Sequence, residues 1–159
     1  MTASAAPTVR EGTPADRDAV LALLPRLAAF ELPPSRVPEH LWEGDAELVR
    51  RWAAGQEPGC LVHLAVESDG TVAGAAVTRM RPELLSHEPS AHLEALVVRE
   101  GAEGRGIGGA LMAAVEAGVR GRGARTLTLH VFRTNEWARA LYSRLGFDCE
   151  LLRYLKQLD

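Results

Sequence analysis

The sequence predicts an α/β fold in which one mixed sheet and its helices form a single domain over residues 1–159. Two observations favour this fold class. Apolar stretches of strand length alternate along the chain with amphipathic stretches of helical period. Their order is one strand, two helices, three strands, a helix, a strand, a helix and a final strand, and 159 residues suffice to bury one core.

In the N-terminal half, a short strand is expected at Thr8–Glu11. The helix that follows has Thr13 as its N-cap and Pro14 in its first position, where proline is tolerated. Pro25 is expected to kink or split this helix. A second helical region follows a proline-rich loop and ends at Gly55.

The second half begins with a β-hairpin around the turn Asp69-Gly70, a dipeptide typical of tight hairpins. Later, Gly146 suits the left-handed position after a helix, with Phe147 folding back on its last turn. The two strands of the hairpin are expected at 60–68 and 71–80. Three later strands are expected at 91–99, 126–132 and 149–158, with one helix between the first and second of these and another between the second and third.

Composition excludes several classes of protein. Hydrophobic residues make up 47% and charged residues 25%, which favours a folded chain over a disordered one. A net charge of −3 provides no general attraction for nucleic acid. Cys60 and Cys149 show no metal-like or redox spacing, and no apolar run approaches the length of a membrane span. We expect a soluble cytoplasmic protein without a metal, nucleic-acid or membrane partner.

The stretch "EGRGIGGALM", residues 103–112, is a glycine-rich turn that opens a helix, an arrangement that often brings backbone amides close to a phosphate. It satisfies the dinucleotide pattern G-x-G-x-x-G, but the next strand ends in Val131, Phe132 and Arg133, without the acidic residue that would hold a ribose. A nucleotide-triphosphatase loop is excluded because Gly109 is followed by Ala110, not by lysine. A tight turn without any ligand is the simple alternative.

A second motif, "NEWARALYSRLGF", lies at residues 135–147. The two motifs in this order resemble the acetyl-coenzyme A loop and the N-x-x-A-x-x-x-Y-x-x-x-G-F segment of the GNAT superfamily of N-acetyltransferases. The resemblance covers residue 91 to the C-terminus in detail and the N-terminal half in element order. It implies a mixed, mostly antiparallel sheet of about six to seven strands flanked by about four helices.

The resemblance implies transfer of an acetyl group from acetyl-CoA to a primary amine of a small molecule or peptide, by direct attack. The loop departs from the family at Glu103, where arginine or glutamine is usual. We expect Glu103 to face solvent and Arg105 to supply a cation. The cofactor-binding residues that the resemblance implies are Leu96, Val97, Val98, Glu103, Gly104, Arg105, Gly106, Ile107, Gly108, Gly109, Asn135 and Ala138.

Two residues are the candidate catalytic groups. Tyr142, a phenol protonated at neutral pH, is the expected general acid, and Glu94 is the expected general base, directly or through water. His92 is the reserve base. Both catalytic candidates have a structural alternative: Tyr142 packs in the helix, and Glu94 faces solvent or pairs with an arginine. For the cofactor-binding candidate Asn135, the alternative is that it caps the helix instead of binding the pantetheine arm.

Two questions of function stay open at this stage. A non-catalytic coenzyme A-binding sensor or interaction module is the alternative to an enzyme, and a homodimer is compatible with the chain. Carboxylates in the segments that frame the acceptor favour a cationic amine. They are Glu31, Glu39, Glu43, Asp45, Glu47, Glu83 and Glu88.

Overall fold

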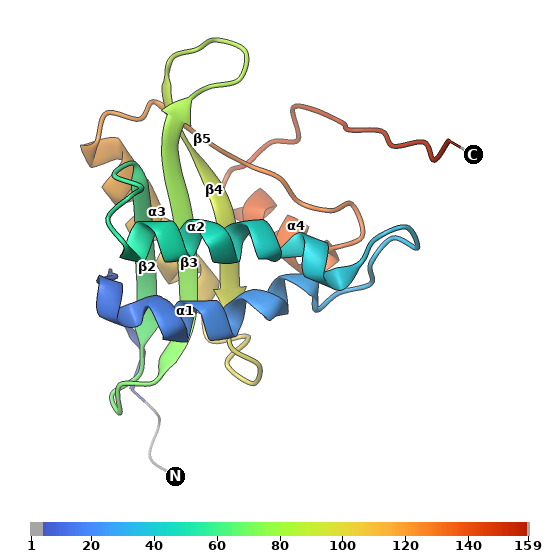
Figure 1. Cartoon of the computed structure of the whole chain (residues 1–159). Helices are drawn as coiled ribbons and strands as arrows, with labels where there is room; N and C mark the ends of the chain where they lie inside the picture. The colour runs from blue at the N-terminus through green and yellow to red at the C-terminus, as the bar shows by residue number, and fades with distance from the viewer. Residues whose placement is uncertain (1–4, 159) are drawn as a thin grey trace.

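A computed structural model describes residues 5–158 and shows a central sheet between two helical layers (Figure 1). The strands of this range follow the order of the sequence across the sheet, and each pairs antiparallel with the next until the last, which is parallel to its neighbour. They are β1 (Thr8–Glu11), β2 (Cys60–Val66), β3 (Val72–Pro82), β4 (Pro89–Val98) and β5 (Thr126–Leu129).

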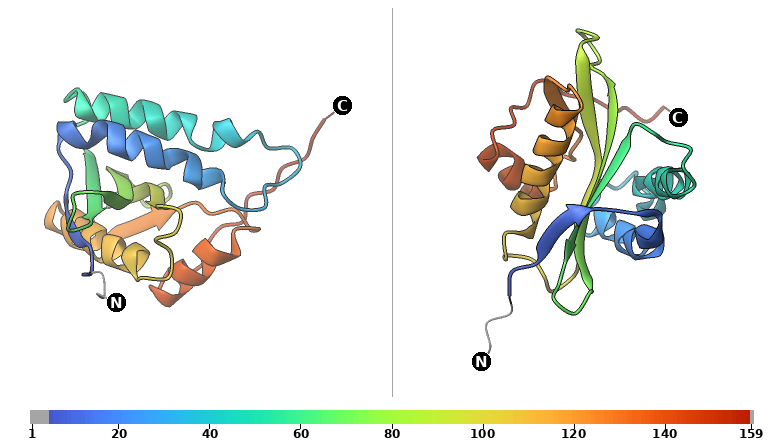
Figure 2. Two further views of the ribbon diagram at one scale, coloured as in Figure 1. Left: turned by 90° about the horizontal axis from the view of Figure 1, so that it is seen from below. Right: turned by 90° about the vertical axis from the view of Figure 1, so that its left-hand side faces the viewer.

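The two helical layers cover opposite faces of the sheet (Figure 2). The first layer contains α1 (Arg17–Leu23) and α2 (Glu43–Ala53), and the second contains α3 (Ile107–Gly121) and α4 (Glu136–Arg144). Short 3-10 helices extend the first layer at Pro14–Asp16, Leu24–Ala28 and Pro38–Leu41.

Each layer buries its own apolar core against the sheet, because neighbouring residues of a strand point to opposite faces. One core joins α1 and α2 to β2, β3 and β4, and includes Val20, Leu24, Val49, Leu64 and Val77. The other joins α3 to the opposite face and includes Ala76, Leu93, Ile107, Leu111 and Val115.

Most local predictions are confirmed. β1 has the expected bounds, and Thr13 and Pro14 occupy the N-cap and first position of the opening helical turn. The helix splits at Pro25, since α1 ends at Leu23 and continues as a 3-10 helix. After α4, Gly146 adopts a φ of 90°, and the amide of Phe147 donates to the carbonyl of Tyr142 at 3.0 Å.

The expected number of strands is wrong. Residues 5–158 contain five strands, not six to seven, because residues 149–158 pair with no other strand of that range. The strand expected at 126–132 also ends early, at Leu129. Its pairing with β4 stops there, and an extended segment becomes a strand only beside another strand that accepts its hydrogen bonds.

A β-bulge interrupts β4 at Glu94. In the register with β3, Leu93 faces Thr78 and Ala95 faces Val77, so Glu94 is the extra residue. Leu93 belongs to the core under α3, whereas Ala95 belongs to the core under α1 and α2. The bulge therefore exchanges the faces of β4 and places a charged side chain next to this exchange.

Gly74 is a close-packed position in β3, and we expect Gly74→Ala to destabilise the fold. A methyl group there would lie 2.9 Å from the carbonyl oxygen of Val97 and 3.0 Å from the side chain of Ile107. Overpacking of this kind lowers the free energy of unfolding by about 1–3 kcal/mol, measurable by urea denaturation. Gly44→Ala is the control, since nothing lies within 4 Å of its added carbon. An equal loss in both variants would contradict the argument from packing.

Candidate active site

A cavity of about 410 Å³ opens where β5 separates from β4. The two strands pair from Ser90–Thr126 to Leu93–Leu129, and within the described residues the rest of β4 has only β3 beside it. Residues Leu93–Val98 form one wall of the cavity, Leu129–Phe132 form another, and α4 and the first helical layer close the remaining sides.

The cavity brings together many of the residues that the sequence singles out. The segment 104–109 follows Glu103 directly but is not part of the cavity lining. The candidates that do line it are Glu94, Leu96, Val97, Val98, Glu103, Asn135, Ala138 and Tyr142.

The glycine loop presents free backbone amides. Gly104 and Gly106 have φ values of 75° and 76°, in the left-handed region that side chains disfavour, and open space surrounds both. No described residue accepts a hydrogen bond from the amides of residues 104–109, which point from the N-terminal end of α3. Such a set of donors fits a pyrophosphate.

Gly108 has a different role from its neighbours. A carbon added there would lie 3.1 Å from the side chain of Leu141, so the glycine allows α3 and α4 to approach closely. Ile107 is buried in the core beneath α3. The loop therefore combines open positions facing solvent with packed positions that hold its helix in place.

Both charged side chains of the loop have partners on other segments. Glu103 is exposed to solvent, as expected, with 41% of its side chain accessible. Glu103 accepts hydrogen bonds from Arg26 at 2.6 Å and from the amide of Gly101 at 2.8 Å. Arg105 binds Glu67 through two contacts of 2.6 and 3.1 Å. Arg26 thus supplies the cation at the cavity wall. The sequence did not indicate it, because it lies 77 residues before Glu103.

The aromatic ring of Tyr142, on α4, is largely buried. The ring packs edge-on against Phe147 with 5.7 Å between centroids. Burial raises the pKa of Tyr142 to about 12, because the phenolate loses its hydration there. The hydroxyl is therefore protonated at neutral pH. Tyr142 packs against its neighbours, as the structural alternative expects, and it also lines the cavity.

Glu94 is both paired with an arginine and part of the cavity wall. Arg79 on β3 donates to its Oε1 at 2.9 Å, and the side chain of Glu94 is 16% exposed. This contact holds the carboxylate in one orientation. None of the residues 5–158 donates a hydrogen bond to its second oxygen, Oε2.

A second carboxyl group, that of Asp45 on α2, lines the same cavity. Burial raises the pKa of Asp45 to about 7, the negative charge of Glu94 adds to this effect, and Arg79 opposes it. The sequence had indicated Asp45 only as one of several acidic residues. It shares a helix face with the buried Leu48 and Val49, and a carboxylate on an apolar stripe was the signal that could have found it.

Of the two histidines near the cavity, one lines it and the other does not. His92 is buried, with its Nδ1 2.7 Å from Thr128 Oγ1, and does not belong to the cavity lining. Burial, together with the charge of Arg81, lowers the pKa of His92 to about 4, so its ring is neutral at neutral pH. His130, whose ring lies 4.7 Å from that of His92, does line the cavity and was not among the candidates.

Asn135 caps α4. Its Oδ1 accepts a hydrogen bond from the amide of Ala138 at 3.2 Å, which is the capping alternative considered from the sequence. Asn135 also lines the cavity, and Ala138 is 6% exposed at its wall. The cap therefore fixes the end of α4 at the cavity.

In residues 5–158, no cluster of three or more histidine, cysteine or acidic side chains is arranged to hold a metal ion. In the same range, every helix is too short or too polar to cross a membrane.

Residues 24–147 match the model of the acetyltransferase (GNAT) family. This match covers most of the chain, including the cavity, the glycine loop and α4. The chain therefore belongs to the GNAT family and is an acyl-CoA-dependent N-acetyltransferase.

Relatives with known sequences or structures agree with this assignment. The chain is 31% identical over 149 residues to aminoglycoside N(6')-acetyltransferase type 1 of Stenotrophomonas maltophilia, covering 91% of this chain and 88% of that protein. A putative acetyl transferase from Pyrococcus furiosus shares the fold with a TM-score of 0.77 at 19% identity, over 95% and 99% of the two chains. AAC(6')-Iy, solved with the bisubstrate analogue CoA-S-monomethyl-acetylneamine, shares it with a TM-score of 0.69 at 21% identity, over 95% and 98%.

We expect Asp45→Asn to stabilise the protein at high pH. A folded-state pKa raised from 3.8 to about 7 means that the native protein binds this proton more tightly than the unfolded chain. The stabilisation is present below pH 4 and is lost as the pH rises through 7. Asparagine carries no such loss, so the free energy of unfolding of the variant should exceed that of the native chain by about 1 kcal/mol or more at pH 8.

Urea denaturation between pH 4 and pH 8 measures this difference. Asp148→Asn, which changes an exposed carboxylate outside the cavity, is the matched control and should show no such trend. A constant difference between Asp45→Asn and the native chain across this range would contradict the raised pKa.

Proposed function

We propose that this protein transfers the acetyl group of acetyl-CoA to a primary amine of a small cationic molecule by direct attack. The observation that carries this proposal is the cavity itself. It joins the open edge of β4, the phenol of Tyr142 and the carboxyl groups of Glu94 and Asp45 in one space beside the glycine loop.

The chain's own residues fit the coenzyme. The amides of Gly104–Gly109 and the guanidinium of Arg26 would hold the pyrophosphate. The backbone of Leu96–Val98, which lacks a strand partner on the β5 side in the described range, would pair with the pantetheine amides as an added strand does. When bound, acetyl-CoA supplies a thioester carbonyl to the cavity.

Two proton transfers are assigned to residues on different elements, Glu94 on β4 and Tyr142 on α4. Glu94, whose Oε2 accepts no hydrogen bond from the described residues, accepts the proton of the attacking amine, directly or through water. The hydroxyl of Tyr142 donates its proton to the departing sulfur and regains one from solvent. The new bond joins the amine nitrogen to the acetyl carbon, and the carbon–sulfur bond breaks.

Charge in the cavity favours a cationic acceptor. Glu94 and Asp45 are both acidic. Burial favours the neutral form of Asp45, and an ammonium group bound beside it would oppose this effect by stabilising the carboxylate. The Stenotrophomonas maltophilia relative is named for its action on aminoglycosides, which agrees with an acceptor bearing several amines. We therefore propose a small polyamine-like or aminosugar acceptor.

A thiol-release assay with acetyl-CoA and a panel of amines tests the proposed function. We expect turnover with small molecules that carry two or more ammonium groups, and weaker turnover with neutral or acidic amines. Calorimetry with coenzyme A runs in parallel. Binding of coenzyme A without thiol release for any amine would support the sensor or interaction module instead.

Tyr142→Phe should lower kcat by about 10²-fold or more, because the departing sulfur loses its proton donor. The dissociation constant of coenzyme A should stay within about twofold, since the ring and its packing remain. Tyr154→Phe is the matched control, because Tyr154 is the other tyrosine of the chain and is 87% exposed outside the cavity. An unchanged kcat in Tyr142→Phe would remove the phenol from the mechanism.

Glu94→Gln should reduce kcat/KM by about 10²-fold and flatten the acidic limb of its pH profile, because the amide accepts no proton from the amine. Glu88→Gln provides the comparison, as Glu88 is half exposed and pairs with Arg125 outside the cavity. If the acidic limb persists in Glu94→Gln, another group accepts the proton, and Asp45 and His130 are the other candidates that line the cavity.

A further inference from the structure

Three arginines lie in or next to the glycine loop, and each of them is paired with a carboxylate. Arg99 and Arg105 both contact Glu67, at 3.4 and 2.6 Å. Arg26 contacts Glu103 at 2.6 Å. The loop thus has free backbone amides, but its cations are already neutralised. A phosphate that binds to the loop must compete with a carboxylate for any of these arginines.

The two carboxylates differ in how firmly they are held. Glu67, directly after β2, is 11% exposed and binds two arginines. Glu103 binds one arginine, and its second oxygen accepts a hydrogen bond from the amide of Gly101 at 2.8 Å. Of the two, only Glu103 lines the cavity. Because its side chain is already half exposed and hydrated, Glu103 is the carboxylate that a ligand in the cavity can displace.

Arg26 has a further contact that does not depend on Glu103. Its Nε donates to the carbonyl oxygen of Val98, the last residue of β4, at 3.4 Å. This bond keeps the guanidinium at the cavity wall when the carboxylate leaves. The Nη2 of Arg26, which binds Glu103, then becomes available to an anion. A planar guanidinium with several donors suits a phosphate as well as it suits a carboxylate.

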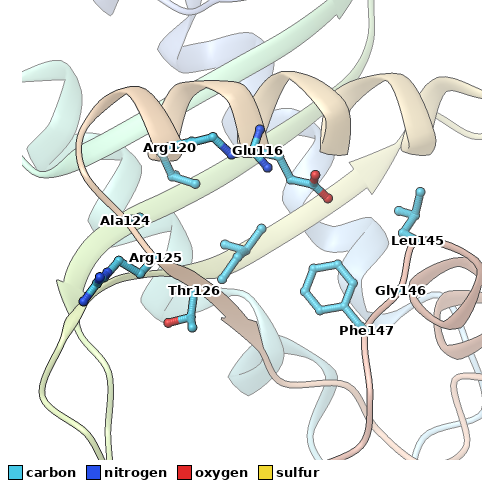
Figure 3. A pocket seen from close by; sticks show the side chains of 10 residues that line it. Glu116, Arg120, Ala124, Arg125, Thr126, Leu145, Gly146 and Phe147 are labelled. Carbon is cyan, nitrogen blue, oxygen red and sulfur yellow. The ribbon is translucent and has the colours of Figure 1, made fainter.

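A groove of about 220 Å³, near the opposite end of α3, also contains arginines (Figure 3). Arg120 and Arg125 line it, together with the acidic Glu116. Arg120 belongs to the last turn of α3, where carbonyl groups carry the negative end of the helix dipole. The dipole disfavours a phosphate at this end and favours one at the glycine loop. The competition for the coenzyme's phosphates therefore concerns Arg26 and the loop.

We propose that Glu103 is an internal competitor of the coenzyme. Its carboxylate holds Arg26 in the free protein, and the pyrophosphate of acetyl-CoA displaces the carboxylate and takes its place on Arg26. Glu103 therefore lowers the affinity for the coenzyme, and it returns to Arg26 when the product coenzyme A leaves. This inference rests on the proposed function, which assigns the pyrophosphate to the amides of the loop and to Arg26.

Calorimetric titration with coenzyme A measures this effect as a dissociation constant. We expect Glu103→Gln to bind coenzyme A about five- to tenfold more tightly than the native chain, because Arg26 is free and a negative charge is removed. Damage to the fold would weaken binding and could not produce this result. Glu100→Gln is the matched control, since it removes the same charge from an exposed side chain outside the cavity lining. Its dissociation constant should stay within about twofold of the native value.

A double-mutant cycle with Arg26→Gln separates competition for Arg26 from simple repulsion of the phosphates. Arg26→Gln alone should weaken binding by about fivefold, whereas Arg120→Gln, at the other end of α3, should leave it unchanged. If Glu103 acts through Arg26, the gain from Glu103→Gln should fall to about twofold or less in the Arg26→Gln background. A gain as large as in the native background would mean that Glu103 only repels the phosphates, and would overturn the proposal.

A second ligand identifies the phosphate that meets Arg26. 3′-Dephospho-coenzyme A keeps the pyrophosphate but lacks the phosphate on the ribose, and it should show the same gain in Glu103→Gln. A gain that disappears with this ligand would assign the contact to the ribose phosphate and contradict the proposal. If coenzyme A binds neither the native chain nor Glu103→Gln, the proposed function itself fails. Ordinary binding to the native chain without a gain in Glu103→Gln would overturn this inference alone.

Discussion

The separation of β5 from β4 is the constraint on which the site depends. Parallel pairing holds the two strands together as far as Leu93 and Leu129, and beyond this point the described part of β4 keeps a partner on one side only. Backbone groups left in this way need other partners, and the cavity provides room for a ligand to supply them. The glycine loop follows directly from this strand, so a ligand lying along β4 meets free amides where it ends.

The bulge at Glu94 and the turn at Gly146 position the chemistry around that gap. The bulge places Glu94 where β4 changes faces, and Arg79 holds it there, so that a charged side chain lines the cavity within an otherwise apolar strand. On the other side, the Asn135 cap and the left-handed Gly146 fix both ends of α4, and Tyr142 lies between them. The proposed acid and the proposed base thus belong to separate elements, α4 and β4.

The charged groups around the cavity form pairs that no single segment contains. Arg26 binds Glu103, which lies 77 residues further along the chain, and Arg105 binds Glu67. Asp45 of α2 lines the same cavity as Glu94, whose charge helps to raise the pKa of Asp45. Residue types alone indicated Arg105 as a cation of the loop and Glu103 as a solvent-facing side chain. Glu103 is exposed, but the partners of both side chains come from distant segments, because a long charged side chain binds whichever opposite charge the packing brings near it.

By itself, the sequence determined the α/β class, the order of helices and strands as far as α4, the helix start at Thr13, the helix break at Pro25 and the turn at Gly146. These follow from local rules: hydrophobic period, proline geometry and the conformational freedom of glycine. The family was indicated by the resemblance of two motifs, at residues 103–112 and 135–147. Tertiary structure decided which charges meet, that Asp45 joins Glu94, and that residues 149–158 remain without a strand partner in the described chain. The physical reason is that pairing between distant segments depends on where the sheet ends and how its strands diverge, and neither property is encoded within a short stretch of sequence.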